Sequence, residues 1–270
     1  MKFLFGISML LTFSALFAQN SVSICSWNLR DFGQTKSDQE ISFIAETVKD
    51  FDILAIQEVV AGYGGAQAVA RLSDELNRKG WKWNYIISEP TFSSSYKVER
   101  YAYLWKPGRV KKVGETWLEQ KFKKEIDREP YYANFEMNGK LFTLVSFHAI
   151  TKSKQPETEI KYFRYLPLEY PDKNLIFCGD FNCPQSHTVF NPLKAMGYKS
   201  VFVNQKTTLR QQCINGDCLA SEFDNIFYHA TKVRLLNSGV VHFYNRCTSI
   251  QTASMISDHI PVFINFSFYP

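Results

Sequence analysis

The sequence predicts an α/β protein in which two packed β-sheets are flanked by helices. Short apolar runs of strand length alternate with segments whose apolar residues recur at helical spacing. Asn138-Gly139 separates two of the strand-like runs and is a strong hairpin signal. Strands, helices and hairpins in this mixture are typical of two sheet layers covered by helices. No repeat and no linker rich in Ser, Gly or Pro interrupts the chain, so we predict one domain.

The first third of the chain predicts two strands and two helices. The strands are the apolar runs at residues 22–27 and 53–56. The apolar positions of the two helices are Ile41, Ile44 and Val48 in the first, and Val69, Leu72 and Leu76 in the second. Ser37 with Glu40 forms a capping-box pattern at the start of the first helix, and Gly80 is the expected end of the second.

The rest of the chain is richer in strands. Further strands are expected at residues 83–87, 101–105, 131–137, 140–147, 175–178, 226–228, 240–243 and 260–268. Two more helices are expected at about residues 156–166 and 186–196, and Gly197 follows the second of them.

The N-terminus has the pattern of a secretory signal peptide. Met1-Lys2 gives a charged start, residues 3–17 are apolar, and Ala18 is a small residue at the exit. We predict a signal peptide over residues 1–18, an exported domain over residues 19–270, and a secreted or periplasmic location. A retained membrane anchor is the alternative, but the apolar run is short for a transmembrane helix, and no later segment is long and apolar enough to span a bilayer.

Size and charge are compatible with one enzyme domain. About 250 residues follow the signal peptide, which suits a single large α/β domain. The formal net charge of the whole chain is +5 at pH 7. A modest positive excess is compatible with a polyanionic substrate without requiring one.

Six cysteines follow the signal peptide: Cys25, Cys178, Cys183, Cys213, Cys218 and Cys247. An exported protein can form disulfides, and the turn-like segment between Cys213 and Cys218 makes these two the best local pair. Cys25 and Cys178 lie in apolar strand runs and are interpreted as buried thiols. A zinc site is disfavoured because no cysteine pair has two-residue spacing and no histidine pair joins them.

Polar side chains gather at the ends of the predicted apolar strands. They are Asn28, Glu58, His148, Asp180, Asn182, Asp258 and His259. Burying such groups without partners costs several kcal/mol, so they are poor core residues. We therefore predict that the strand ends converge on one polar rim.

The carboxylates and amides of this rim have the chemistry of a magnesium site. Mg²⁺ prefers oxygen ligands, usually one or two carboxylates together with waters and substrate phosphate. Zinc would require more nitrogen or sulfur. One Asp or Asn alone would be interpreted as a cap or turn residue, but Asn28, Glu58, Asp180, Asn182 and Asp258 together favour a metal site.

Two histidines are candidates for proton transfer. His148 and His259 each follow or precede a strand, and a neighbouring carboxylate would orient the ring and raise its basicity. Asp224 and Glu99 are the candidate partners. Two such pairs facing one phosphate would provide a general base and a general acid.

These residues occur in an order that resembles the endonuclease/exonuclease/phosphatase superfamily, and within it the deoxyribonuclease I branch. The matching segments are Asn28-Leu-Arg-Asp-Phe-Gly33, Gln57-Glu58, Ser95-Tyr-Lys-Val-Glu-Arg-Tyr101, Arg128-Glu-Pro130, His148, Gly179-Asp-Phe-Asn182, Asp224 and Ser257-Asp-His259. The resemblance implies a four-layer α/β/β/α sandwich with two mixed sheets. The segment that ends at Tyr101 and the one that begins at Arg128 are more particular to nucleases and carry the substrate prediction.

The resemblance also implies roles. Glu58 would bind Mg²⁺ (with Ca²⁺ or Mn²⁺ as further candidates), near Asn28 and Asp258. His259 with Asp224 would be the general base, and His148 with Glu99 the general acid. Asp180 and Asn182 would position water and the scissile phosphate. The residues expected to contact substrate are Arg30, Tyr96, Arg100 and Arg128.

The implied function is a secreted, monomeric endodeoxyribonuclease of low sequence specificity that leaves 5′-phosphates on DNA. One alternative is an exported phosphatase or phosphodiesterase acting on lipid, inositol-phosphate or nucleotide substrates. Another is a binding protein with a decayed site, which is disfavoured because every matched position carries a competent residue.

Two segments depart from the family pattern. The segment from Tyr96 to Glu99 has one residue more than the usual spacing, and the approach to Asp224 is longer. The second difference leaves open whether Cys183 pairs with Cys213, Cys218 or Cys247.

Overall fold

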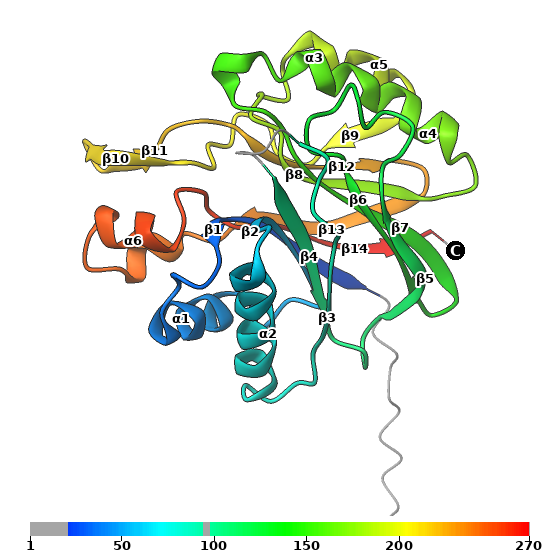
Figure 1. Cartoon of the computed structure of the whole chain (residues 1–270). Coiled ribbons are helices and arrows are strands. Elements are labelled where there is room, and N and C mark those ends of the chain that lie inside the picture. The colour runs from blue at the N-terminus through cyan, green and yellow to red at the C-terminus, as the bar shows by residue number, and fades with distance from the viewer. Residues whose placement is uncertain (1–20, 94–97, 270) are drawn as a thin grey trace, which may run out of the picture.

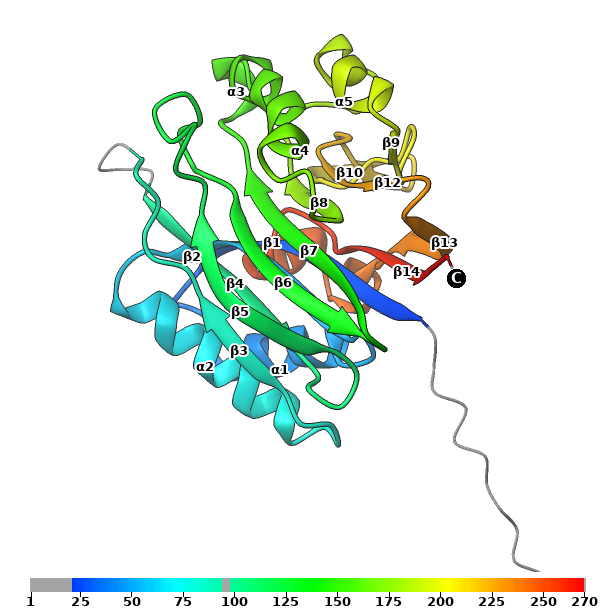
Figure 2. The ribbon, with the colours of Figure 1, turned by 90° about the vertical axis from the view of Figure 1, so that its right-hand side faces the viewer.

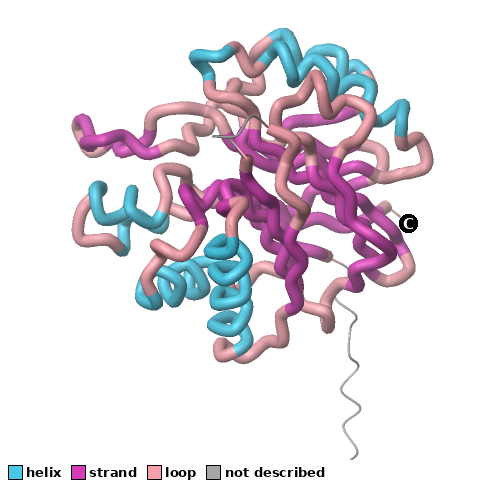
Figure 3. The backbone as a smooth tube through the Cα atoms, viewed as in Figure 1, coloured by secondary structure: helices cyan, strands magenta, loops and turns pink. Residues whose placement is uncertain are grey.

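The computed structural model describes residues 21–93 and 98–269. Two six-stranded sheets pack face to face, and helices cover the outer face of each (Figures 1 and 3). This arrangement confirms the predicted four-layer sandwich. The predicted signal peptide and Tyr96 lie outside the described residues. Within those residues, no helix combines the length and apolar character needed to cross a membrane.

The first sheet has the strand order β13-β14-β1-β2-β4-β3. Its strands are β1 (Val22–Phe32), β2 (Ile53–Val60), β3 (Asn84–Ile87), β4 (Glu99–Trp105), β13 (Val233–Val240) and β14 (Val262–Phe268). β1 and β2 run parallel, and the other pairs are antiparallel. The parallel pair brings Asn28 and Glu58 to the same edge of the sheet.

The second sheet has the order β5-β6-β7-β8-β12-β9. Its strands are β5 (Lys111–Leu118), β6 (Tyr131–Met137), β7 (Lys140–His148), β8 (Leu175–Asp180), β9 (Tyr198–Ser200) and β12 (Asp224–His229). β7 and β8 run parallel, so that His148 lies opposite Asp180. Antiparallel β12 places Asp224 opposite Asp180 on its other side. Three candidate residues are thus neighbours by register alone.

The longer helices cover the first sheet. They are α1 (Asp38–Val48) and α2 (Tyr63–Asn77). α1 begins with the predicted capping box, in which the Ser37 hydroxyl accepts from the Glu40 N–H and the Glu40 carboxylate accepts from the Ser37 N–H. Such a box satisfies two N–H groups that a helix start otherwise leaves unpaired.

Short helices cover the second sheet and flank the chain end. Over the second sheet lie η1 (Lys152–Lys154), α3 (Glu157–Ile160), η2 (Lys161–Tyr165), α4 (Leu166–Glu169), η3 (Thr188–Phe190) and α5 (Asn191–Ala195). Before β14 lie η4 (Phe243–Arg246) and α6 (Ile250–Ile256). A separate hairpin of β10 (Leu209–Ile214) and β11 (Asp217–Leu219) projects from the same side as α6 (Figure 1), which is the side turned away from the viewer in Figure 2.

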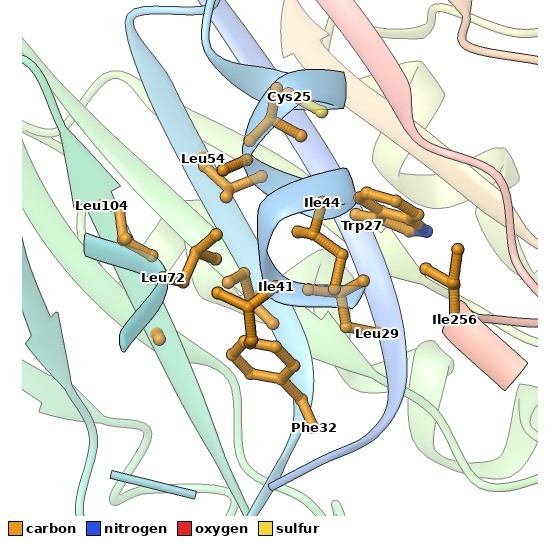
Figure 4. Packing of buried hydrophobic residues seen from close by; sticks show 14 of the residues in the cluster. Cys25, Trp27, Leu29, Phe32, Ile41, Ile44, Leu54, Leu72, Leu104 and Ile256 are labelled. Carbon is orange, nitrogen blue, oxygen red and sulfur yellow. The ribbon is translucent and has the colours of Figure 1, made fainter. Parts of the chain in front are cut away.

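Three apolar clusters hold the layers together. The first joins α1 and α2 to the first sheet, where Trp27 and Leu72 are among the side chains drawn in Figure 4. The second lies between the sheets and includes the buried rings of Tyr103 and Tyr131, which stack with centroids 5.2 Å apart. The third lies under α3 to α5 around Phe163. Burial of this apolar surface holds the two sheets against each other. It therefore also fixes the positions of the polar residues at the shared edge of the sheets.

Several elements differ from the sequence prediction. The two helices expected near residues 160 and 190 are each divided into short helical turns; α4 and α5 have a proline in their first turn. The strand expected at residues 240–243 is wrong after its first residue, because β13 ends at Val240 and η4 begins at Phe243. The unpredicted elements are β5, β9, β10, β11, β13 as far as residue 239, and α6. They are short or largely exposed, so they lack the apolar pattern on which the prediction depended.

The predicted pairing of Cys213 with Cys218 is confirmed, and Cys183 forms no disulfide. Cys213 and Cys218 form a disulfide with an S–S distance of 1.96 Å. Cys25, Cys178 and Cys183 are buried free thiols. The pairings considered for Cys183 are therefore not formed, and the disulfide instead closes the β10–β11 hairpin.

Candidate active site

The strand ends of both sheets meet at one polar cluster centred on Asp180. Asn28 lies in β1, where the pairing with β2 changes register, and donates through Nδ2 to Glu58 Oε1 at 2.9 Å and to Asp180 Oδ2 at 3.2 Å. The first acceptor belongs to the same sheet and the second to the opposite sheet. One amide therefore joins the two halves of the sandwich where the predicted rim residues converge.

His259 forms one histidine–carboxylate pair. Its Nδ1 lies 2.7 Å from Asp224 Oδ2, and its Nε2 lies 3.5 Å from Asp180 Oδ2. Burial acts to lower the pKa of His259, but the adjacent carboxylates of Asp224 and Asp180 outweigh it and hold that pKa well above its usual value. The imidazolium form is therefore stabilised at this position.

His148 forms the second pair in a different electrostatic setting. Its Nδ1 lies 2.9 and 3.0 Å from the two carboxylate oxygens of Glu99. Burial, assisted by the nearby Arg128 charge, lowers the pKa of His148 to about 4, and burial raises the pKa of Glu99 to about 7. The surroundings therefore favour the neutral form of His148 and the charged form of His259.

Asp180 and Asn182 lie between the two pairs. Asp180 Oδ2 is 3.5 Å from Nε2 of both His148 and His259. Its other oxygen accepts from the Asn182 N–H at 2.8 Å, and Asn182 Nδ2 donates to Ala149 O at 3.0 Å. Burial raises the pKa of Asp180. The two imidazole Nε2 atoms thus face a common point from opposite sheets.

Left-handed backbone occurs at three residues of this cluster. Asp31, Glu58 and Asn182 have φ values of 49°, 59° and 49°. Residues other than glycine adopt such values at a cost in energy, and they do so mainly where surrounding contacts hold them. Here the Asp31 N–H donates to Glu58 Oε2 at 3.2 Å, so that the backbone of β1 holds a carboxylate of β2.

The donor set of the cluster fits a hard cation. Asn28 Oδ1 is buried and has no hydrogen-bond partner in the described structure. The Glu58 side chain is about a quarter exposed and lines an open cleft of about 400 Å³ together with His148 and Arg128. An orphaned amide oxygen beside an accessible carboxylate is suitable for Mg²⁺ or Ca²⁺. Asp180, Asp224 and His259 also present ligand atoms within 4.8 Å of one another, a grouping that differs from the predicted ligand set. Asp258 is partly exposed next to it.

The predicted substrate contacts occupy different environments. Arg30 lies on the rim with half of its side chain exposed. Arg100 donates to Ala61 O at 2.9 Å and Ser88 O at 2.7 Å, and buried Arg128 donates to His148 O at 2.9 Å and to Ala149 O. Arg100 and Arg128 therefore hold backbone segments around the cleft.

Several supporting residues were not predicted. Trp27 Nε1 donates to His259 O at 2.8 Å, and the Ser257 hydroxyl donates to Asn28 O at 2.6 Å. Thr207 Oγ1 accepts from the Asp224 N–H at 2.9 Å. Ser257 was visible as part of a motif, but its partner is 229 positions away in sequence. Trp27 and Thr207 carry no local signal for such contacts.

Glu159 connects the loop of Arg128 to the segment after His148. Its two carboxylate oxygens accept from the Asp127 N–H at 3.1 Å and the Ile150 N–H at 2.7 Å. Burial raises the pKa of Glu159 from 4.5 to about 7. Because the folded-state value is above the unfolded value, the contribution of this proton to stability is present below pH 4.5 and is lost as the pH rises through about 7.

Glu159→Gln should therefore flatten the pH dependence of stability. Between pH 4.5 and 8, the unfolding free energy of the wild type should fall by about 3 kcal/mol relative to that of the variant, at 1.36 kcal/mol per pKa unit. Urea unfolding of both proteins at the two pH values measures this difference. The lost backbone hydrogen bond adds a pH-independent offset, so equal differences at both pH values would contradict the prediction.

Comparison with known proteins identifies a common family. The model of the Endonuclease/Exonuclease/phosphatase family matches residues 25–259. Deoxyribonuclease-1 of Bos taurus is 31% identical over 180 residues, which cover 62% of this chain and 62% of that protein, so the match spans less than two thirds of its length. A deoxyribonuclease of Thioalkalivibrio sp. is 26% identical over 266 residues, covering 90% of this chain and 70% of that protein.

Solved structures share the fold. An endonuclease/exonuclease/phosphatase family protein from Bacteroides thetaiotaomicron superimposes with a TM-score of 0.66 at 17% identity, covering 93% of this chain and 98% of that one. A mannosyl-6-phosphatase from the same species gives 0.64 at 17% identity, covering 92% and 100%. Identities this low establish the architecture alone.

Proposed function

The chain belongs to the endonuclease/exonuclease/phosphatase family, and from this premise we propose that it is a divalent-metal-dependent endodeoxyribonuclease. The observation that carries the proposal is the position of two histidine–carboxylate pairs on either side of Asp180. The Nε2 atoms of His148 and His259 each lie 3.5 Å from the same carboxylate oxygen. Two proton-transfer groups that face one point suit a displacement at a phosphate, which needs one proton removed and one supplied.

The reaction is hydrolysis of a phosphodiester. A water oxygen attacks phosphorus in line with the leaving 3′-oxygen, and the P–O3′ bond breaks. One imidazole Nε2 accepts the proton of the water, and the other donates a proton to the 3′-oxygen, which leaves a 5′-phosphate. A cation held by Glu58 and Asn28 would stabilise charge on the phosphate. Asp224 and Glu99 hold the rings in position. Asn182 donates to both oxygens of Asp180 and to Ala149 O, so it would act by positioning Asp180.

The similarity to deoxyribonucleases favours DNA as the proposed substrate. The bovine and Thioalkalivibrio proteins are both named as deoxyribonucleases. The cleft beside Glu58 is open and is lined by the positively charged Arg128. Half-exposed Arg30 neighbours Asp31, another residue of the cleft wall, and a guanidinium can form paired hydrogen bonds with phosphate. Contacts to the phosphate backbone carry little sequence information, so we propose low sequence specificity. Export through residues 1–18 and action as a monomer belong to the same proposal.

Removal of divalent cations should abolish cleavage. Without the cation, charge on the phosphate loses its main stabilisation, so we expect supercoiled plasmid to remain intact in EDTA and to be nicked and fragmented once Mg²⁺ is restored. Gel electrophoresis measures cleavage of the plasmid. Mannose 6-phosphate and a lipid phosphodiester are tested separately as alternative substrates. If plasmid stays intact with Mg²⁺ while one of these is hydrolysed, the protein is a phosphatase or phosphodiesterase of another class and the nuclease proposal is wrong.

A further inference from the structure

A second pocket of about 500 Å³ lies beside the catalytic cleft, and the hydrolysis described above does not use it. We name it the flanking pocket; its walls are the loop after β1, the start of α1, strand β10 and helix α6. β10 and α6 project from the same side of the molecule (Figure 1), and Gln251 Nε2 donates to Gln211 O at 3.0 Å between them. Asp31 lines both the flanking pocket and the cleft of Glu58, so the two are contiguous.

The charges around the flanking pocket balance. Arg30 lies 3.7 Å from Asp31. Lys36 donates through Nζ to Met255 O at 2.7 Å and Ile256 O at 2.8 Å, which commits its ammonium group to the end of α6. Glu40 supplies the second negative charge. With two positive and two negative groups, the pocket has no excess charge for a further phosphate and suits an uncharged part of the substrate.

The remaining wall consists of neutral polar groups and one exposed thioether. Within the described structure, the side-chain amide of Gln211 forms no hydrogen bond. Gln251 donates through Nε2, and its amide oxygen accepts no hydrogen bond there. Side-chain amides match the adjacent donor and acceptor groups on the edge of a nucleobase. Met255 is 68% exposed, and a flexible thioether packs well against the face of an aromatic ring.

Several contacts fix the flanking pocket relative to the catalytic residues. The Leu209 N–H donates to Asp258 O at 2.7 Å, which joins the base of β10 to the segment of His259. The disulfide between Cys213 and Cys218 closes the other end of the hairpin. Lys36 holds the end of α6 from the loop after β1. A pocket formed in advance binds its ligand without an ordering cost.

We propose that the flanking pocket binds an unpaired nucleobase next to the scissile phosphate. The proposal rests on the proposed function, in which the cleft holds a phosphodiester, and it adds the substrate class. A base inside a duplex already uses its pairing edge and both faces, whereas an unpaired base can offer them to Gln211, Gln251 and Met255. The enzyme therefore acts on single-stranded or locally opened DNA.

The test compares two ligands that differ only in their bases. One is fluorescent hexathymidylate, and the other is a hexamer of the same sugar-phosphate backbone with abasic units. Binding is measured by fluorescence anisotropy with Mg²⁺ present, in a His148→Ala background that slows cleavage. We expect the Gln211→Ala/Gln251→Ala variant to bind hexathymidylate at least about tenfold more weakly than its parent, and to bind the abasic hexamer as the parent does.

Gln212→Ala is the matched control, because Gln212 is an exposed residue of the same strand that does not line the flanking pocket. It should leave both affinities unchanged, and equal melting temperatures show that all variants are folded. Unchanged hexathymidylate binding in the double variant, or an equal loss for both ligands, would overturn the inference. Cleavage assays with active enzyme are separate: cleavage of DNA without base-dependent binding of the hexamer removes this inference alone. Base-dependent binding without cleavage of either plasmid or single-stranded DNA removes the proposed function alone.

Discussion

Replacing His259 by alanine should lower kcat for DNA cleavage by at least about a hundredfold, the usual contribution of general acid or base catalysis. The imidazole is buried, lies 2.7 Å from Asp224 Oδ2, and directs Nε2 toward the point that His148 also faces. The backbone of His259 is held in place: Trp27 Nε1 donates to its carbonyl oxygen, and its N–H donates to the Ser257 hydroxyl. Initial rates on plasmid, with Mg²⁺ in excess, measure the effect.

His242→Ala is the matched control, because His242 is exposed and its described ring contacts are confined to Tyr244. It should retain full activity. Asp224→Ala should reduce kcat as well, but the double variant His259→Ala/Asp224→Ala should be little worse than His259→Ala alone, because groups that act as a unit are not additive. Full activity in His259→Ala, or additive losses in the double variant, would contradict the assignment.

Gly179→Ala should destabilise the fold by roughly 3–5 kcal/mol, at the upper end of single-residue effects. Gly179 has a φ of +137°, which L-residues with a side chain rarely adopt. A Cβ there would lie 1.9 Å from Phe147 O, on the neighbouring parallel strand. Since both atoms are held by the sheet, the strands must separate beside Asp180 and His148. Urea unfolding followed by tryptophan fluorescence measures the loss.

Gly108→Ala provides the comparison. A Cβ at Gly108 meets no atom within 4 Å, and its φ is not in the positive range. We expect its unfolding free energy to stay within about 0.5 kcal/mol of the wild-type value, as for ordinary surface changes. A Gly179→Ala protein that is as stable as Gly108→Ala would show that the sheet can accommodate the side chain, contrary to the prediction.

The sequence predicted which residues belong to the candidate site, but not how their side chains are arranged in space. Polar groups such as Glu58 and His148 follow apolar strands, and this pattern identifies them because unpaired burial is costly. The central position of Asp180, which contacts both histidines and Asn28, depends on the register of β7, β8 and β12. Register arises from sheet pairing between distant segments and leaves no trace within any one of them.

The fold, like the site, was predictable only where local sequence determines the structure. The capping box at Ser37, the long apolar strands and the pairing of Cys213 with Cys218 were predicted correctly, because local sequence determines caps, burial and short loop closures. The short exposed strands β10 and β11 were not predicted. They are stabilised by contacts at their base, such as that of Leu209 with Asp258, and not by their own apolar pattern.

By itself the sequence determined the two-sheet architecture, the polar rim and the residue types on it, because strand length, helical spacing and the cost of burying polar groups are local properties. Only the tertiary structure decided that the pKa of His148 is lowered while that of His259 is raised, since burial and the charges of Arg128, Asp180 and Asp224 come from other segments. It alone also placed β10 and α6 around a neutral pocket that adjoins the cleft at Asp31. Electrostatic environment and cavities arise from packing between segments far apart in sequence, which no local pattern records.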